Sequence, residues 1–281
     1  MVLDRKDMGT PGRFLQFILL VLTVIVTGCV TEAPETSEDD IETDMQESES
    51  TPDVGDFRVV YGQTTNSDHA GYELLFRSSQ TFEMLAEELN SLFILPQDIP
   101  IVFAECGEAN AFYDQESSQI QMCYELLDHL SETFYLEELS NDEYDKAIID
   151  TWIFIFYHET GHALVNVLDL PMTGGEEDSV DAFATFILTL GDYSDAALNG
   201  AIFFLLDAQT TDLEDLPLWD EHSLGDQRFY NIICWVYGSN PQEYSYLVEE
   251  GILPESRAEI CPAEYQQIAT SWDRITEPYV K

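Results

Sequence analysis

Positively charged residues are scarce in this sequence. Only 10 lysines and arginines stand against 55 aspartates and glutamates, which gives a formal net charge of −45. A surface of this charge repels the phosphates of nucleic acids and the headgroups of anionic membranes, so we expect no nucleic-acid partner. The acidity fits a solvated surface that keeps the protein soluble, and it also fits a cationic partner or a habitat in which salt screens the repulsion.

The N-terminal apolar run is too short to cross a membrane as a helix. It covers residues 14–26, and a helix of this length is about 20 Å long, whereas the hydrocarbon core of a bilayer is about 30 Å thick. Arg5, Lys6 and Arg13 precede the run, and a basic start followed by a short apolar stretch is typical of a secretory signal.

The end of this run, Val26-Thr27-Gly28-Cys29, resembles the lipobox of bacterial lipoproteins. The resemblance implies that residues 1–28 are a lipoprotein signal peptide, that Cys29 is acylated, and that the chain is anchored to the cell membrane or envelope with its folded part outside the cytoplasm. An ordinary signal peptide, or a short anchor with an incidental cysteine, is the alternative. Residues 29–56 contain eleven acidic residues and no lysine or arginine, so we expect a disordered acidic tether before a folded domain at 57–281.

No C-x-x-C pair occurs among the remaining cysteines, which disfavours a cysteine-ligated metal. Their even number indicates two disulfides in an exported chain. Cys106 and Cys123 flank a short stretch that reads as a hairpin, and Cys234 and Cys261 flank a helix-and-turn segment. We expect pairing in that order, although the spacing alone leaves the connectivity open.

The apolar pattern predicts one α+β domain, in which a small N-terminal mixed sheet is followed by a mainly helical part. Apolar runs bounded by turn residues predict strands at 57–61, 99–105, 111–113 and 119–124. Helical periodicity predicts helices at 72–93, 176–190, 194–208, 226–237, 241–250 and 262–275. Gly238 and Gly251 are the expected stops of the helices that precede them.

A long central helix is predicted from the capping box of Ser140 and Glu143 to about Leu168. Its middle is apolar nearly all round, so we expect it to be buried. His158-Glu159-Thr160-Gly161-His162, an H-E-x-x-H motif, lies near its end. Residues four apart share a helix face, so His158 and His162 can bind one zinc ion while Glu159 takes a proton from a metal-bound water.

A zinc hydrolase needs a third protein ligand and an open position for water. Glu177 is the first candidate because it lies near the start of the next helix, with Asp181 one turn further on the same face. Asp181 is expected to accept a hydrogen bond from the non-ligating nitrogen of a zinc-bound histidine. Glu176 is the alternative ligand, although it could simply favour the N-terminus of the helix.

The H-E-x-x-H motif followed by Glu177-x-x-x-Asp181 resembles the gluzincin class of metallopeptidases, to which thermolysin belongs. Asn110-Ala111-Phe112-Tyr113 is similar to the edge strand with which those enzymes hold a peptide in β-pairing, whereas an ordinary hairpin strand is the alternative. The runs 106–113 and 175–183 resemble a bacterial family of putative zinc metallopeptidases of unknown substrate. These resemblances cover most of residues 57–275 and imply a zincin-like fold.

The sequence therefore predicts a membrane-tethered peptidase that uses one Zn²⁺ ion and a glutamate base to hydrolyse peptide or protein substrates; it gives no indication of the oligomeric state. His222 is the first candidate for stabilising the oxyanion, ahead of Tyr230 and Arg228, although a surface histidine at a helix entry is the alternative. His69 and His129 lie in polar contexts and are interpreted as solvated.

The alternative function is a catalytically inactive, zinc-stabilised binding lipoprotein with the same fold. Glu159 favours catalysis over this alternative, because a metal site kept only for stability has no need of a carboxylate there. A structural lipoprotein without metal would require both motifs to be accidental.

Overall fold

The computed structural model describes residues 52–281 except 136, 138 and 210–218. The expected signal peptide, Cys29 and most of the expected tether lie outside the described residues. The strands are β1 (Phe57–Tyr61), β2 (Ile99–Ala104), β3 (Ala111–Asp114) and β4 (Gln119–Cys123). The helices are α2 (Ser67–Ser79), α3 (Thr81–Leu92), α4 (Tyr124–Tyr135), α5 (Asn141–Val167), α6 (Glu176–Leu190), α7 (Ser194–Ala208), α8 (Gly225–Ser239), α9 (Tyr246–Glu249), α10 (Glu255–Ala258), α11 (Cys261–Thr276) and the 3-10 helix η1 (Glu277–Tyr279).

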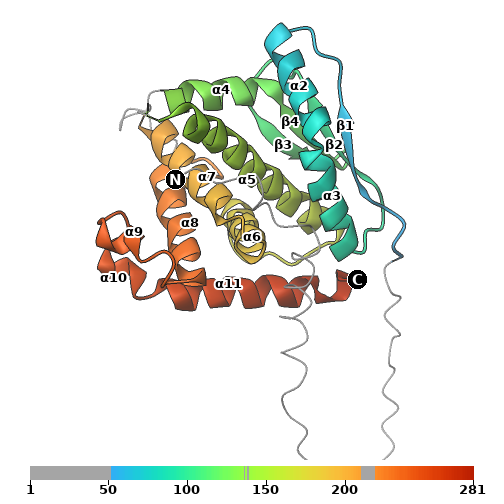
Figure 1. Ribbon diagram of the computed structural model, residues 1–281. Helices are drawn as coiled ribbons and strands as arrows, with labels where there is room; N and C mark the ends of the chain where they lie inside the picture. The colour runs from blue at the N-terminus through green and yellow to red at the C-terminus, as the bar shows by residue number, and fades with distance from the viewer. Residues whose placement is uncertain (1–51, 136, 138, 210–218) are drawn as a thin grey trace, which may run out of the picture.

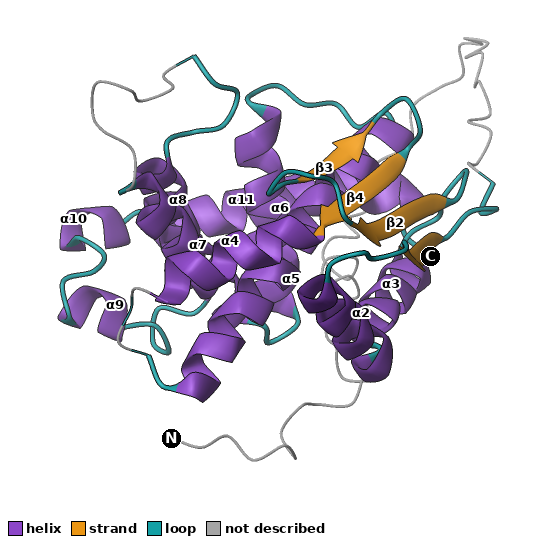
Figure 2. Cartoon of the chain, turned by 90° about the horizontal axis from the view of Figure 1, so that it is seen from above, coloured by secondary structure: helices purple, strands orange, loops and turns teal. Residues whose placement is uncertain are grey.

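The four strands form one mixed sheet in the order β1-β2-β4-β3, which confirms the expected α+β class. β1, β2 and β4 run parallel, and β3 pairs antiparallel with β4 at the edge. The strands gather at one side of the molecule, and α7 and α8 lie toward the other (Figure 2). Because β3 is the last strand in the order, one of its edges is covered by no described strand.

Helix α5 lies in the middle of the fold, between the sheet and the helices α6 and α7 (Figure 1). Ser140 caps it with the expected capping box, in which the side chains of Ser140 and Glu143 each accept from the other's backbone N–H. Gly200 on α7 lets the two helices approach closely, because a Cβ there would lie 2.7 Å from the Phe154 ring. The expected central, buried helix is confirmed.

Two of the expected helices are interrupted. The helix predicted over 72–93 is two helices, α2 and α3, separated by Gln80 in the left-handed conformation (φ 54°). Of the helix predicted over 241–250, only α9 is helical, although Gly251 (φ 75°) does follow it as the stop. Helical periodicity alone therefore missed the break at Gln80 and the turn of residues 241–245, and it also missed α4 and α10.

Gly238 was wrongly predicted to end its helix. It lies inside α8, where a Cβ would be only 2.3 Å from the carbonyl oxygen of Cys261. The glycine thus serves the close approach of α8 and α11 rather than the helix end. The two expected disulfides, Cys106–Cys123 and Cys234–Cys261, are confirmed, and the second joins these same two helices.

Hydrogen-bonded structure begins a few residues before Phe57. The backbone N–H groups of Val54 and Gly55 both donate to the carbonyl of Leu95 at 3.0 Å. At the other end of the chain, Lys281 lies 2.8 Å from the Asp53 carboxylate, so the two ends of the described chain meet. Within the part of the chain that the structure describes, no helix has the length and apolar character needed to span a bilayer.

Candidate metal centre

Helix α5 presents the two motif histidines on one face, one turn apart. Their ring centroids are 5.0 Å apart, and the His158 ring is buried while His162 is partly exposed. Because α5 is packed on several sides, the backbone that carries these rings has little freedom to move. The helix therefore sets the spacing of the pair before any ligand binds.

Helix α6 brings Glu177 against both rings. His158 Nε2 lies 3.2 Å from Glu177 Oε2, and His162 Nε2 lies 3.3 Å from Glu177 Oε1. Gly161, inside the motif, makes this approach possible, because a Cβ there would lie 2.9 Å from the side chain of Val180 on the first turns of α6. The packing of α5 against α6 thus requires a glycine at position 161 of the motif.

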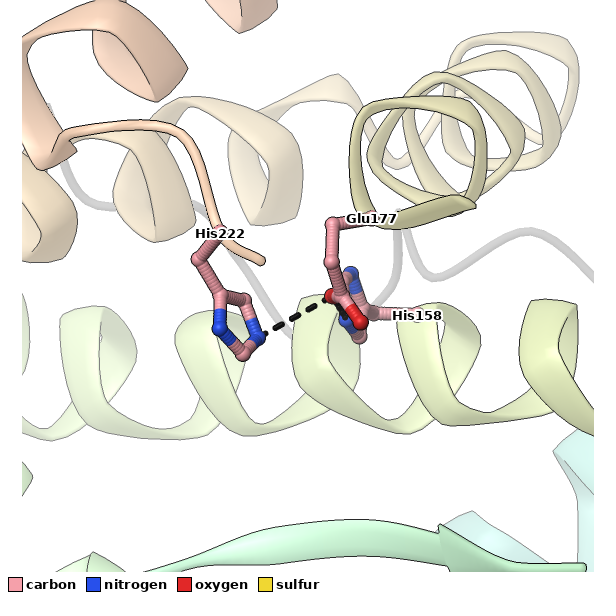
Figure 3. Close-up of side chains that lie close together, drawn as sticks. All are labelled: His158, Glu177 and His222. Atoms are coloured by element: carbon pink, nitrogen blue, oxygen red, sulfur yellow. Dashed lines mark ion pairs between the residues drawn. The ribbon is translucent and has the colours of Figure 1, made fainter. Parts of the chain in front are cut away.

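His222 reaches the same carboxylate from the loop before α8. Its Nε2 lies 3.0 Å from Glu177 Oε2, and its ring stacks over that of His158 with centroids 6.5 Å apart (Figure 3). Asp220 fixes the ring, since one carboxylate oxygen lies 2.9 Å from His222 Nδ1 and also accepts the backbone N–H of His222 at 2.9 Å. Three imidazoles therefore surround one carboxylate.

The distances from the three histidine nitrogens to the Glu177 carboxylate match the separation of ligands around a tetrahedral metal ion. Ligands bonded to zinc at about 2.0–2.1 Å lie about 3.3 Å apart at tetrahedral angles. Glu177 Oε2 is buried and accepts no well-directed hydrogen bond from any described residue, although two imidazole nitrogens lie within 3.2 Å of it. The candidate ligand atoms of His158, Glu177 and His222 all lie within 4.8 Å of one another. An imidazole–carboxylate donor set with an orphaned buried oxygen suits a divalent metal ion, zinc among them.

Carboxylates hold the opposite nitrogens of the two motif rings. His158 Nδ1 lies 2.8 Å from Asp181 Oδ1, and His162 Nδ1 lies 2.7 Å from Glu176 Oε1. With each Nδ1 hydrogen-bonded to a carboxylate, each Nε2 is left to face Glu177. The sequence indicated Asp181 for this position, but it did not indicate Glu176 as the partner of His162.

Arg228 on α8 supports Asp181 from behind. Its Nε and Nη2 donate to the two oxygens of Asp181 at 2.8 and 2.7 Å, and its guanidinium carbon lies 3.5 Å above the Phe204 ring. This bidentate pair holds the carboxylate that orients His158. Arg228 was considered only as an oxyanion donor, because a partner from another helix leaves no local signal in the sequence.

The buried charges shift the protonation of the centre. Burial acts to lower the pKa of His162, but Glu177, Glu159 and Glu176 outweigh it and raise that pKa to about 9. Burial also opposes the charge of Glu177, yet the three imidazoles hold its pKa far below the ordinary value. A metal ion must displace the protons held by the imidazoles, so the affinity of the site for a metal ion falls as the pH falls.

Glu159 lies beside the histidines and is almost completely buried. Burial raises its pKa, and the charges of His158 and His162, with a smaller contribution from the backbone of Tyr113 on β3, oppose that shift. Its Oε2 is buried with no hydrogen-bond partner among the described residues. A carboxylate with a free oxygen and a raised pKa is suited to accept a proton.

The edge strand β3 lies next to this glutamate. Cys123 N–H donates to the Asn110 carbonyl at 3.2 Å, so in an antiparallel ladder the backbone groups of Ala111 and Tyr113 face away from β4. The Tyr113 hydroxyl donates to Asn166 Oδ1 on α5 at 2.9 Å, which ties the strand to the motif helix. The exposed side of the segment Asn110-Ala111-Phe112-Tyr113 can therefore pair with an extended peptide.

The remaining candidate residues lie apart from these contacts. Tyr230 is exposed and lines a surface cavity of about 390 Å³ together with Asp178 and Ser223. The interpretation of His69 as solvated is wrong, because its ring is buried between Glu105 and Asp128. His129 is partly exposed and pairs with Asp207 at 2.9 Å.

A family model described as "Putative metallopeptidase" matches residues 61–276. The matched range contains the three histidines, Glu159, Glu177 and the whole of β3. Neither the search of curated proteins nor the search of solved structures found a match.

Proposed function

The chain belongs to this family of putative metallopeptidases, and from that premise we propose that it is a zinc-dependent peptidase that hydrolyses peptide bonds in peptides or proteins. One observation carries the proposal: the imidazoles of His158, His162 and His222 converge on the carboxylate of Glu177, beside a buried glutamate with an unpartnered oxygen. A metal site with a free base at its side is the arrangement that hydrolysis needs.

His158, His162 and Glu177 would hold the zinc ion, as the spacing of the motif indicates. When bound, zinc would polarise the scissile carbonyl and lower the pKa of a water toward about 7. Glu159 takes the proton of that water at its unpartnered Oε2 and passes it to the leaving amine. The raised pKa of Glu159 suits both transfers, because the group must release the proton it accepts.

His222 donates a hydrogen bond to the oxygen on which negative charge develops. The Asp220 carboxylate at Nδ1 stabilises the doubly protonated ring, in which Nε2 also carries a proton and can donate it to a hydrogen bond. Asp181 and Glu176 orient the ligating rings through their Nδ1 atoms. These carboxylates therefore act through the histidines and do not touch the substrate.

A peptide substrate would pair with the exposed side of β3. The outward backbone groups of Ala111 and the carbonyl of Tyr113 supply the hydrogen bonds of an added antiparallel or parallel strand. Because the amide of Tyr113 also faces Glu159, a peptide bound there lies near the proposed base. Main-chain pairing binds peptides of many sequences, which fits a peptidase.

In the same proposal the protein is a lipoprotein, acylated at Cys29 and held outside the cytoplasm by the acidic segment 29–56. The sequence supports this through the basic start, the short apolar run and the lipobox-like end. The two disulfides add support, because disulfides persist in oxidising compartments outside the cytoplasm.

The second candidate function is the catalytically inactive, zinc-stabilised binding lipoprotein. It is favoured by one observation, the 3.0 Å contact that brings His222 into the same group of ligand atoms as His158 and Glu177. With His222 as a fourth protein ligand the site would be closed to water, as in structural zinc sites. The two functions therefore differ in the role of His222.

The zinc content of the full-length protein tests both functions. We expect one equivalent of zinc, which His162→Ala loses and His129→Ala, the control, retains. His222→Ala should retain zinc and lose peptide hydrolysis if the residue is a donor, whereas it should weaken zinc binding if the residue is a ligand. A folded wild-type protein that stays free of zinc after zinc is added would rule out both functions.

A further inference from the structure

The loop of residues 105–110 determines where the edge strand β3 lies. It connects β2 to β3, and both of its ends are bound to the same residue of β4. Near its start Cys106 forms the disulfide to Cys123, and at its end the Asn110 carbonyl accepts the Cys123 backbone N–H at 3.2 Å. The loop is thereby closed on β4 by one covalent bond and one hydrogen bond, directly before the strand that faces Glu159.

Glu125, in the first turn of α4, holds the middle of this loop. Its two oxygens accept the backbone N–H groups of Cys106 at 3.0 Å and Gly107 at 2.7 Å. Gly107 adopts a positive φ of 80°, a conformation that allows the chain to turn tightly at this point. The carboxylate therefore fixes the path of the loop next to the disulfide.

The strand itself has few other attachments. β3 is four residues long, pairs on one side with β4, and is tied to α5 through the hydroxyl of Tyr113. A short edge strand is easily displaced, and a displaced strand offers a peptide fewer main-chain hydrogen bonds. The position of β3 thus depends strongly on the closed loop that precedes it.

The two disulfides differ in their accessibility. Cys106 is half-buried, whereas Cys123, Cys234 and Cys261 are fully buried. Thiol–disulfide exchange requires that a thiolate reach one of the two sulfur atoms. The disulfide that includes Cys106 is therefore the more accessible of the two to a dithiol.

We propose that the Cys106–Cys123 disulfide positions the peptide-binding strand β3, and that its reduction by a dithiol weakens peptide binding while the metal ligands stay in place. The inference rests on the proposed peptidase function. In the exchange, the dithiol transfers two electrons and two protons to the Cys106–Cys123 bond and leaves as a disulfide, while the protein gains two thiols. His158, His162 and Glu177 lie on α5 and α6, outside the 16 residues that this bond encloses (107–122).

The test compares two full-length variants, Cys106→Ser/Cys123→Ser and Cys234→Ser/Cys261→Ser, on one peptide substrate. We expect KM to rise about tenfold in the first variant, with kcat changed less than about twofold, because binding is lost and the catalytic groups remain. Zinc content should be unchanged in both. The second variant is the control: it lowers the melting temperature but leaves KM as in the wild type.

Glu125→Gln is a second variant that keeps the disulfide and weakens the hydrogen bonds to the loop. It should raise KM in the same direction by a smaller factor. Unchanged KM values in this variant and in Cys106→Ser/Cys123→Ser would overturn the proposal. So would a fall in kcat at unchanged KM, because the disulfide would then act on the catalytic groups.

Hydrogen exchange separates a failure of this inference from a failure of the proposed function. Amides of residues 107–114 should exchange faster after reduction, whereas those of α5 and α6 should exchange as before. This result supports the positioning role even if the wild-type protein hydrolyses no peptide. Unchanged exchange at 107–114 after complete reduction of Cys106–Cys123 would overturn it.

Discussion

Two clusters of histidines and carboxylates in this protein have similar compositions and opposite geometries. In the convergent cluster, formed by His158, His162, His222 and Glu177, three rings direct their Nε2 atoms at one carboxylate. In the bridging cluster, formed by His69, Glu105 and Asp128, one ring lies between two carboxylates. Its Nδ1 is 3.2 Å from Glu105 and its Nε2 is 2.9 Å from Asp128.

The geometry determines what each cluster can do. Convergence gathers lone-pair donors around one point and leaves a buried oxygen of Glu177 without a well-directed hydrogen bond, which suits a cation. The two nitrogens of His69 point to different carboxylates, so three ligand atoms do not gather at one point there. Among the described residues, only His158, Glu177 and His222 form such a group. The bridging cluster instead joins α2 and α4 to the start of the loop before β3, which is a structural role. A histidine near acidic residues therefore indicates a metal site only when the ring atoms converge.

The largest effect is expected for Glu159→Gln beside the convergent cluster. The substitution removes the proposed base but no ligand, so hydrolysis should fall by about 10²–10⁴-fold with zinc content unchanged. Steady-state kinetics and metal analysis on the same preparation measure both quantities. Asp128→Asn in the bridging cluster is the control, which should lower the melting temperature and retain hydrolysis. Full activity in Glu159→Gln would eliminate the mechanism.

A smaller effect is expected when a carboxylate that contacts a ring nitrogen loses its charge. Asp181→Asn weakens the orientation of His158, so zinc affinity should fall by about 10–100-fold. The same change in the bridging cluster, Asp128→Asn, should leave zinc affinity unchanged. Competition with a chelator measures the affinities. Equal losses in the two variants would mean that general destabilisation, and not ring orientation, controls metal binding.

The parts of the site that could be predicted are those whose residues lie close together in the sequence. The capping box of Ser140, the one-turn spacing of His158 and His162, and the one-turn spacing of Glu177 and Asp181 are all local patterns. Contacts made between distant elements left no such pattern. Arg228 reaches Asp181 across 47 residues, so its place in the centre could not be read from the sequence.

His69 was misread for the same reason. Its partners Glu105 and Asp128 lie 36 and 59 residues away, so a histidine in a polar stretch gave no sign that it would be buried between two carboxylates. The fold shows the same difference between local and distant signals. The strands and the capped helix α5, which have local signals, were predicted correctly. The break at Gln80 was not, because no glycine or proline marks its left-handed conformation.

The last prediction concerns the pH dependence of the bridging cluster. Burial acts to lower the pKa of His69, but Asp128 and Glu105 outweigh it, with a further contribution from Glu125, so the pKa is raised above 6.5. Because the pKa of His69 is raised, its ring stabilises the folded protein fully below pH 6.5. This stabilisation is lost as the pH rises through the folded-state pKa of His69. Hydrogen bonds from the Asn66 amide, from Thr65 and from His69 lower the pKa of Glu105 to about 2, so its contribution is lost as the pH falls from about 4.5 toward 2.

The difference in melting temperature between the wild type and His69→Gln should therefore be largest between about pH 4.5 and 6.5 and should shrink on both sides. The uncharged Tyr72 and Tyr124, which pack on the ring, do not titrate in this range. Melting curves of the metal-free proteins from pH 3 to 9 give the measurement without interference from zinc. A difference that is constant across this range would mean that the His69 ring contributes by packing alone, and the contrast between the two clusters would then rest on the convergent one.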